Sequence, residues 1–565
     1  MAPLSLSVST QSGPVTGYSD TYPLRATTSA REPPTGGRHP VLKWLGIPYA
    51  QAERWKRPQA PTPWKKPKEC FEFGSMFPQP PSNTEVLMSK LPGFILRNHV
   101  PVSEDSHFVN VVAPGDLQEG EKLPVLVWIY GGALNNGTAD RFFYDPTEWV
   151  RDGAARGQRC IIVSGNYRTN IFGFASHPDL AAEDQDGLSG NYGLYDCIAM
   201  LEWVQQNISS FGGDASNVTV FGQSAGAFLI SHLLVSGKKL FRKAICQSGA
   251  AGTMMLRPVE KAYPAYDSLL TALSIPPTAS PSERLDALRA APYEALLAHH
   301  IATHNFSALS LTFEPEGKGI WTEDTMRRLE RGEWDEWVEA VVIGTTEDEG
   351  SAFAWGMKLA DPTAFHAYVS QFPSSLQPRV LAKYLAPFGG THPPASDPRI
   401  DFTTAPGSKL LADQIFVNPV WDQAVALSGD GKEEQGKGVP TWMYRLTAGV
   451  STLIKYSPIK LGILHAMDLP LVFNSSSLWA GDQDSPDGKL AAAIGERWMR
   501  FAIEGNPDPS WTPFSPSAPS QLVFSDAGHV ENVSLAEFEK DKLELFFEGH
   551  EREGAGEEVL GRENE

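Results

Sequence analysis

The amino-acid sequence predicts an α/β fold in which a large, mostly parallel sheet carries helices on both faces. Two observations lead to this prediction. In the first half of the chain, short apolar runs alternate with segments whose apolar residues recur at helical spacing. The runs are also apolar along their length, which is typical of strands buried inside such a sheet. An alternation of strand and helix makes successive strands parallel.

Five apolar runs are predicted to be strands of this sheet. They lie at residues 124–130, 160–164, 218–221, 244–247 and 339–344. Between the second and third runs, residues 193–208 show the apolar spacing of a helix. A further apolar helix is expected at residues 227–235, directly after the third run.

Two later segments depart from this alternation and are predicted to be helical insertions. Within residues 255–335, the stretch Ser-Pro-Ser-Glu at 280–283 is typical of a capped helix start, and an Ala/Leu-rich run then continues that helix. A second helical stretch occupies about 358–425. No linker isolates either segment, so we expect one domain, 1–548, with both insertions over one end of the sheet. Residues 549–565 are polar and acidic, as in a disordered tail.

Composition and charge restrict the expected partners. The net charge is −20, and an acidic surface repels both phosphate backbones and anionic lipid. We therefore expect neither nucleic acid nor a membrane as a partner. No run of about 18 apolar residues predicts a transmembrane helix. Residues 1–17 lack the basic start and apolar stretch of a signal peptide, which predicts a cytoplasmic protein.

The four cysteines show no CxxC pair and no spacing typical of metal ligands. Cys160 and Cys246 lie in apolar, strand-like runs, where buried free thiols are expected. The sequence therefore predicts no metal site and no cofactor, and a reducing compartment fits it best.

A serine between small residues is the main candidate for catalysis. Residues 219–227 read Thr-Val-Phe-Gly-Gln-Ser-Ala-Gly-Ala, with Ser224 between Gly222 and Gly226. A predicted strand precedes this stretch and a predicted helix follows it. A sharp strand-to-helix turn needs small flanking residues and exposes the serine hydroxyl at its tip. We therefore interpret Ser224 as a nucleophile rather than as part of an ordinary tight turn.

A serine nucleophile needs a base to take its proton and an acid to orient that base. With this type of turn the acid and then the histidine follow the serine in the chain. The candidate histidines are His366, His392, His465, His529 and His550. His465 is favoured because it lies in a small-residue loop just before an apolar segment, where an imidazole can be packed and aimed inward.

The acid should lie at the end of a strand. Glu347, Asp348 and Glu349 follow the run at 339–344, and the chemistry of the residues alone does not choose between them.

An oxyanion hole needs backbone N–H groups aimed at the developing negative charge. One should come from Ala225, directly after the serine. Others should come from Gly131 and Gly132, which follow the run at 124–130 and allow close approach of the backbone. An ordinary glycine turn is the alternative.

Several longer segments share their pattern with one known family. They are LGIPYAQ at 45–51, SEDSHFVNV at 103–111, VWIYGGAL at 127–134 and the block 190–227 around the serine. The segments LFRKAICQSG, TEDEGSAF, LGILHAMDLPLVF and RWMRFAIEGNPDP follow in the family's order. On these motifs the chain resembles the type-B carboxylesterases, which include the cholinesterases. The resemblance runs from about residue 7 to 530.

The resemblance implies the α/β-hydrolase fold, with the helical insertions over the active site, and a Ser-His-Glu triad. The family's acid is the glutamate of the DEGS string, which corresponds to Glu349, and its base corresponds to His465. Ser248 matches a family serine that supports the triad. The implied oxyanion donors are the amides of Gly132, Ala133 and Ala225.

Five positions depart from the family pattern. Both cysteines of the family's first disulfide are missing, and Ser106 stands at one of these positions. Ala133 replaces the third glycine of the oxyanion segment, so its methyl group narrows the hole or shifts the loop. Ala466 stands where glycine is usual after the histidine, and Asp468 where a glutamate is usual.

Gln223, directly before the serine, is a further departure. Cholinesterases and many of their relatives carry a glutamate at this position, and its carboxylate attracts cationic substrates and stabilises the imidazolium. Glutamine is nearly isosteric but neutral. Loss of one charge in a partly desolvated site costs a bound cation on the order of 1–2 kcal/mol. We therefore expect no preference for choline esters.

Together these features predict a serine carboxylic-ester hydrolase that acts on neutral small-molecule esters through an acyl-enzyme. The same triad also serves lactonases, amidases and acyltransferases, because the acceptor depends on pocket shape and water access. An alternative of another class is a catalytically silent, cholinesterase-like binding or adhesion protein. The sequence gives no indication of the oligomeric state.

Overall fold

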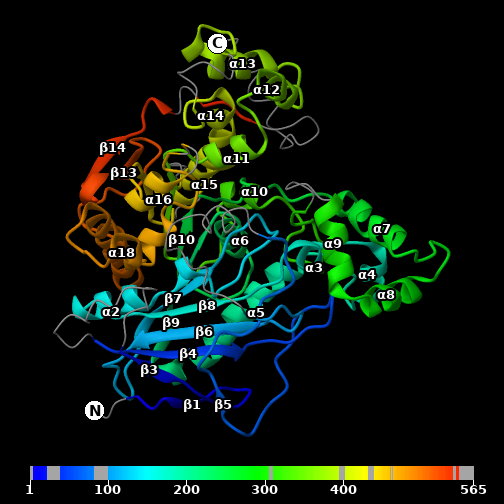
Figure 1. The fold of residues 1–565 in the computed structure, drawn as a ribbon, viewed down its shortest axis with the longest axis vertical. Helices are drawn as coiled ribbons and strands as arrows, with labels where there is room; N and C mark the ends of the chain where they lie inside the picture. The colour runs from blue at the N-terminus through cyan, green and yellow to red at the C-terminus, as the bar shows by residue number, and fades with distance from the viewer. Residues whose placement is uncertain are drawn as a thin grey trace.

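Figure 1 shows the fold of the protein in a computed structural model. The structure describes residues 4–21, 39–81, 100–303, 309–393, 401–429, 438–457, 460, 462–538 and 542–545. Within these residues the main element is an 11-stranded sheet, and a 3-stranded sheet lies near the N-terminus. The small sheet consists of β1 (Ser7–Ser9), β2 (Pro14–Thr16) and β5 (Lys68–Glu69).

The main sheet is parallel in its middle and antiparallel at both sides. In spatial order its strands are β14 (Val530–Ser534), β13 (Ser520–Phe524), β12 (Thr441–Leu446), β11 (Ala340–Thr346), β10 (Lys243–Gln247), β9 (Gly213–Gln223), β7 (Leu123–Ile129), β8 (Ile161–Gly165), β6 (Phe108–Pro114), β4 (Val41–Pro48) and β3 (Tyr18–Asp20). The strands from β13 to β8 pair in parallel, whereas β14, β6, β4 and β3 are antiparallel to their neighbours. The prediction of a mostly parallel sheet is confirmed.

The predicted strand at 218–221 is the one that differs most from its counterpart in the structure. β9 begins five residues earlier, at Gly213, which pairs with Leu123 of β7. Three of the four residues at 214–217 are polar and all four are at least partly exposed, so an apolar run does not mark this part of the strand. The other four predicted strands match β7, β8, β10 and β11 to within two residues.

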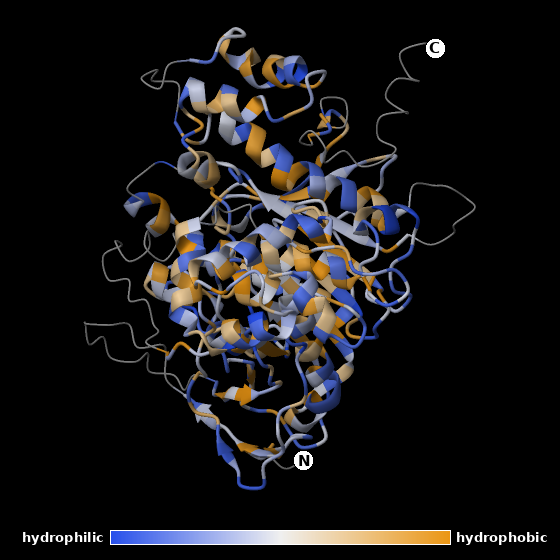
Figure 2. Ribbon diagram, turned by 90° about the vertical axis from the view of Figure 1, so that its right-hand side faces the viewer, coloured by the Kyte–Doolittle hydropathy of each residue, from blue (hydrophilic) through white to orange (hydrophobic). Residues whose placement is uncertain are grey.

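Helices lie on both sides of the sheet (Figure 1). They include α2 (Thr147–Ala155), α3 (Asn170–Phe174), α4 (Pro178–Glu183), α5 (Tyr192–Asn207), α6 (Ala225–Leu233), α16 (Ser451–Tyr456), α17 (Leu469–Val472) and α18 (Pro486–Glu504). The predicted helices at 193–208 and 227–235 correspond to α5 and α6. Figure 2 shows hydrophobic stretches in the middle of the molecule and in the helices at its upper end. The largest buried cluster takes residues from the main sheet and from the helices packed against it.

The first predicted insertion contains α7 (Tyr263–Ala272), α8 (Pro281–Ala290), α9 (Tyr293–Thr303) and α10 (Thr325–Glu330). The predicted capping box is present, because Ser280 and Glu283 bond each other's backbone N–H groups. The prediction of one continuous helix after it is wrong. α8 ends at Ala290, because Pro292 has no N–H and favours an extended conformation at Ala291.

The second predicted insertion forms the upper end of the molecule in Figure 1. It follows α11 (Ser351–Gly356) and contains α12 (Pro362–Val369), α13 (Gln377–Leu385), α14 (Pro406–Ala412), a π-helical turn η5 (Asp413–Val417) and α15 (Asn418–Ser428). A separate buried cluster connects α11 to α14. We call these elements, together with the other residues of the cluster, the upper lobe. The cluster consists of Ala354, Leu359, Phe365, Tyr368, Val369, Phe372, Leu376, Val380, Tyr384, Leu385, Leu410, Leu411 and Leu543.

Residues 542–545 return from the end of the chain to the upper lobe. Lys542 Nζ lies 2.6 Å from Asp422 Oδ1, and Asn418 Nδ2 donates to Leu543 O at 2.8 Å. The tail predicted at 549–565 lies outside the described residues. In the part of the chain that the structure describes, no helix is long and apolar enough to cross a bilayer.

Candidate active site

Ser224 lies at a sharp turn between β9 and α6, as the elbow interpretation requires. Its backbone has φ 58° and ψ −125°, an unfavourable conformation for a residue with a side chain. The amide of Ser224 donates to Gln247 O at 2.8 Å, and its carbonyl accepts from Phe228 N at 2.9 Å. A β-carbon on Gly226 would lie 2.1 Å from Ile129 O, so only glycine allows the turn to pass this close to β7.

The segment after β7 contacts this turn. A β-carbon on Gly131 would lie 2.5 Å from Gln223 O and 2.9 Å from Ser224 Cβ. The preceding residue, Tyr130, is fixed by a reciprocal pair of hydrogen bonds: Tyr130 Oη donates to Tyr167 O at 2.7 Å, and Tyr167 Oη donates to Tyr130 O at 2.8 Å. The glycines are therefore held against the serine by backbone contact.

Three N–H groups at this point are available to a ligand. The amides of Gly132, Ala133 and Ala225 donate to no acceptor among the described residues. Gly132 has φ 119°, and a β-carbon there would lie 1.9 Å from Asn136 O. Ala133 is left-handed, with φ 57°, so the alanine at this position adopts a conformation that favours glycine.

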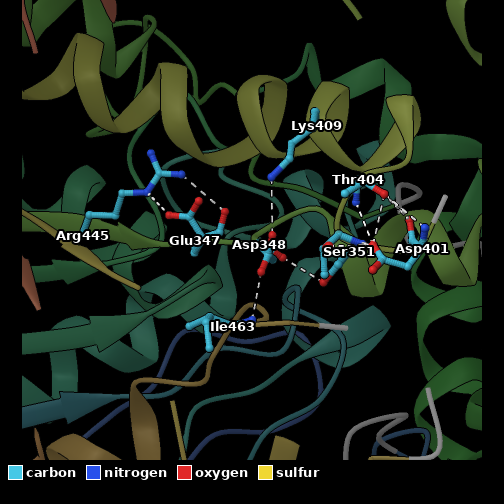
Figure 3. Close-up of polar contacts among 9 residues, drawn as sticks. Glu347, Asp348, Ser351, Asp401, Thr404, Lys409, Arg445 and Ile463 are labelled. Carbon is cyan, nitrogen blue, oxygen red and sulfur yellow. Dashed lines mark hydrogen bonds and ion pairs between the residues drawn. The ribbon is translucent and has the colours of Figure 1, made fainter. Parts of the chain in front are cut away.

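The three carboxylates after β11 point in different directions. Glu349 is fully buried; its Oε1 accepts from Thr346 N at 2.7 Å, and its Oε2 lies 2.5 Å from His465 Nδ1. Glu347 accepts from Arg445 Nε at 2.7 Å instead. Asp348 accepts from Ile463 N at 3.0 Å (Figure 3). Of the three, Glu349 is the one in contact with the favoured histidine.

Aromatic rings hold the His465 imidazole on its other sides. The ring centroid lies 4.4 Å from that of Phe416, in η5, and 5.3 Å from that of Phe353, in α11. The other candidate histidines lie elsewhere: His366 and His529 are exposed, and His392 is buried with its Nδ1 2.7 Å from Pro393 O. His550 lies outside the described residues.

The remaining ring nitrogen of His465 faces Gln223. The two Nε2 atoms are 3.0 Å apart, and the Gln223 side chain is almost completely buried. Among the described residues no hydrogen bond joins Ser224 Oγ to His465. The sequence predicts an effect of Gln223 on substrate charge but not this contact, which joins residues 242 positions apart and has no local signal.

Two further residues named in the sequence analysis lie close to this site. Ser248 has φ 52°, its amide donates to Gly344 O at 2.8 Å, and its buried hydroxyl has no partner among the described residues. Asp468 accepts from Gln247 Nε2 at 2.7 Å and from Tyr444 Oη at 3.2 Å. Burial, with a smaller contribution from Glu349, raises the pKa of Asp468 to about 6.

Comparisons with known proteins agree with this architecture. A profile of the Carboxylesterase family matches residues 28–537. The para-nitrobenzyl esterase of Bacillus subtilis (strain 168) is 31% identical over 512 residues, which cover 87% of this chain and 93% of that protein. The liver carboxylesterase of Sus scrofa is 28% identical over 513 residues, with 85% and 84% covered. A solved thermophilic pNB esterase has a TM-score of 0.69 at 27% identity and covers 95% of this chain and 99% of its own.

The family profile spans most of the chain, and the solved esterase shares its sheet and surrounding helices. The chain therefore belongs to the carboxylesterase family of α/β-hydrolases and is a carboxylic ester hydrolase.

Proposed function

We propose that the protein hydrolyses neutral small-molecule carboxylic esters by covalent catalysis, with Ser224 as nucleophile, His465 as base and Glu349 as the acid that orients the base. One observation carries the proposal. The fully buried Glu349 contacts His465 Nδ1 at 2.5 Å, while Nε2 of the same ring reaches the residue next to Ser224. A base oriented in this way is the arrangement that activates a serine hydroxyl.

The reaction has two halves. Ser224 Oγ forms a bond to the ester carbonyl carbon while its proton passes to His465 Nε2. The bond to the alcohol then breaks, and the leaving oxygen takes this proton from the imidazolium. Water attacks the acyl-enzyme, gives its proton to the same nitrogen, and the acid leaves as Ser224 Oγ regains a proton. For the first step the serine hydroxyl takes the place of the Gln223 amide at Nε2.

The developing negative charge on the carbonyl oxygen is bound by backbone amides. We assign this role to Gly132, Ala133 and Ala225, whose N–H groups have no other acceptor among the described residues. Ala225 is the first residue of α6, and the first N–H groups of a helix have no partner within it. Donors fixed in place need no reorganisation when the charge appears.

The expected substrates are uncharged. Gln223 places an amide where a carboxylate would attract a cation, and the neighbouring Glu349 is already paired with His465. The para-nitrobenzyl group in the name of one relative also carries no net charge. A reducing compartment such as the cytoplasm is part of the proposal, because Ser106 replaces a cysteine of the family's disulfide and the four cysteines are buried and free.

Labelling with a fluorophosphonate tests the nucleophile. The wild-type protein should be labelled, and Ser224→Ala should lose both labelling and about 10³-fold or more of its esterase activity. Ser209→Ala, an exposed serine in η2 (Ile208–Phe211), is the matched control and should react as the wild type does. An unlabelled wild-type protein would instead support the silent binding protein.

Neutral esters of graded acyl length, measured against a choline ester, test the substrate class. The neutral esters should have the higher kcat/KM. Faster turnover of the choline ester would overturn our assignment of Gln223. Mass analysis of the products in the presence of added alcohols and amines would reveal an acyltransferase.

A further inference from the structure

Asp348 joins the turn that carries Glu349 to the loop that carries His465. Its carboxylate Oδ2 accepts from Ile463 N at 3.0 Å, and its own amide donates to Ile463 O at 3.0 Å. The two segments also form a parallel bridge between Asp348 and Leu464, one residue before the histidine. Asp348 and Ile463 are thus joined both by a backbone hydrogen bond and by the Asp348 side chain.

Gly462 shows how tightly this contact is built. A β-carbon on Gly462 would lie 2.1 Å from Asp348 Oδ2 and 2.6 Å from Thr403 Cγ2. The residue is left-handed, with φ 67°. Asp348 and the turn at 401–404 therefore both approach Gly462 closely, and a side chain at this position would collide with both.

The cation near Asp348 contributes less than this backbone contact. Lys409 Nζ, from α14, lies 3.4 Å from Asp348 Oδ1, and the lysine side chain is 46% exposed. Exposed ion pairs at such distances contribute little, because water screens them. The Asp348 side chain itself is only 11% exposed, so its bond to the Ile463 amide is the better-shielded of the two interactions.

The neighbouring carboxylate provides an internal comparison. Glu347 lies in the same turn and is also paired with a cation, Arg445 of β12, at 2.7 Å (Figure 3). Among the described residues its carboxylate forms no hydrogen bond or ion pair with the histidine loop, and its side chain is 37% exposed. The two carboxylates therefore share charge and local backbone but differ in whether they reach Ile463.

We infer that Asp348 is a positioning residue for the base: it fixes residues 462–464 and thereby sets the distance and angle at which His465 meets both Glu349 and the serine. This inference rests on the proposed function, in which His465 moves the proton. A misplacement of a reacting group by about 1 Å can lower the rate by about 100-fold, without loss of substrate binding. Asp348 should accordingly affect kcat rather than KM.

The first experiment compares Asp348→Ala with Glu347→Ala on a neutral p-nitrophenyl ester. Asp348→Ala should lower kcat by about 10–100-fold with KM within about 3-fold. Glu347→Ala should stay within about 2-fold of the wild type, because it loses only a partly exposed ion pair. Asp348→Asn, whose amide oxygen still accepts from Ile463 N, should restore most of the activity. Equal losses in the two alanine variants, or a loss that lies in KM, would overturn the inference.

The second experiment disturbs the contact between Asp348 and the histidine loop by changing the loop instead of the aspartate. Gly462→Ala keeps Asp348 but pushes the histidine loop away from its carboxylate, and it should reproduce the loss in kcat. Gly481→Ala is the matched control: Gly481 has φ 74°, and a β-carbon there meets nothing within 4 Å. Activity in Gly462→Ala equal to that in Gly481→Ala would contradict a positioning role.

Fluorophosphonate labelling separates this inference from the proposed function. In Asp348→Ala the labelling rate of Ser224 should fall in parallel with kcat, while the melting temperature shows that the variant is folded. If Ser224→Ala remained active, the proposed function would fail whatever the Asp348 variants did. If Ser224→Ala were inactive but labelling in Asp348→Ala were as fast as in the wild type, only the role of Asp348 would fail.

Discussion

The candidate site has a nucleophile side and an acid–histidine side, and the segments of each side are held together by a different kind of contact. On the nucleophile side, residues 129–136 and 222–226 meet through bare backbone: β-carbons on Gly131 and Gly226 would lie 2.5 Å from Gln223 O and 2.1 Å from Ile129 O. On the acid–histidine side, residues 346–351 and 462–468 meet through two carboxylates: Asp348 accepts from the Ile463 amide, and Glu349 contacts His465 Nδ1. The first side should therefore be sensitive to added volume, and the second also to lost polarity or altered charge.

Adding a methyl group on the nucleophile side should have the largest effect. Gly132→Ala would force the β-carbon against Asn136 O and move an N–H group that we assign to the oxyanion. We expect kcat to fall by about 100-fold or more, as when one oxyanion donor is lost. Gly120→Ala is the control, since Gly120 also has a positive φ, 84°, but meets nothing within 4 Å. Activity above a tenth of the wild type in Gly132→Ala would show that this side tolerates volume.

Changing a buried charge on the acid–histidine side should alter how stability depends on pH. Burial raises the pKa of Asp468 to about 6, whereas a carboxyl in an unfolded chain titrates near about 4. The native state therefore favours the protonated form, so this contribution to stability is present below pH 4 and is lost as the pH rises through 6.

Asp468→Asn has no such titration. Between pH 4 and pH 7 the free energy of unfolding of the wild type should fall by about 2 kcal/mol relative to that of Asp468→Asn. Urea unfolding at several pH values measures the difference. Asp526→Asn, at an exposed position, should run parallel to the wild type. A difference that stays constant across this range would mean that Asp468 is already charged at low pH.

A charge introduced where the two sides meet should have a smaller effect. The Gln223 amide nitrogen lies 3.0 Å from His465 Nε2. Gln223→Glu would put a carboxylate oxygen in its place and so stabilise the imidazolium. Since the base must be neutral to accept the serine proton, the acid limb of the kcat/KM profile should move up by about one pH unit. A choline ester should gain about 10-fold relative to a neutral ester, and Gln223→Met should show no such gain. A limb that moves to lower pH would contradict this reasoning.

The smallest effect is expected from the two alanines that stand where the family usually has glycine. Ala133 and Ala466 have φ of 57° and 72°, and left-handed backbone costs an alanine about 1–2 kcal/mol. Glycine relieves this strain but makes the unfolded chain more flexible. Ala466→Gly should therefore raise the free energy of unfolding by about 0.5 kcal/mol, whereas Ala493→Gly, in the middle of α18, should lower it by about 1 kcal/mol.

The elements that the sequence predicts well are those with local signals. Continuous apolar runs locate four inner strands to within two residues, and small residues between a strand and a helix locate the turn at Ser224. The break between α8 and α9 also had a local signal, Pro292, which was outweighed by the Ala/Leu-rich run around it.

The choice between the three carboxylates has no local signal. Glu347, Asp348 and Glu349 are adjacent, and their directions depend on Arg445, Ile463 and His465, each about 100 or more positions further along the chain. The resemblance to a family points to Glu349, and in the structure Glu349 is the one of the three that contacts His465. The contact between Gln223 and His465 likewise depends on how the sheet brings distant segments together.

The upper lobe has a consequence for the order in which the molecule can be made. Its apolar cluster takes twelve of its thirteen buried residues from positions 354–411, but the last, Leu543, follows Leu411 by 132 positions. Phe353 and Phe416, which flank the His465 ring, lie in the elements on either side of this cluster. A ribosome adds residue 543 long after the other twelve. The lobe therefore cannot finish packing until residue 543 has been added, and in a nascent chain the surroundings of the base stay incomplete until then.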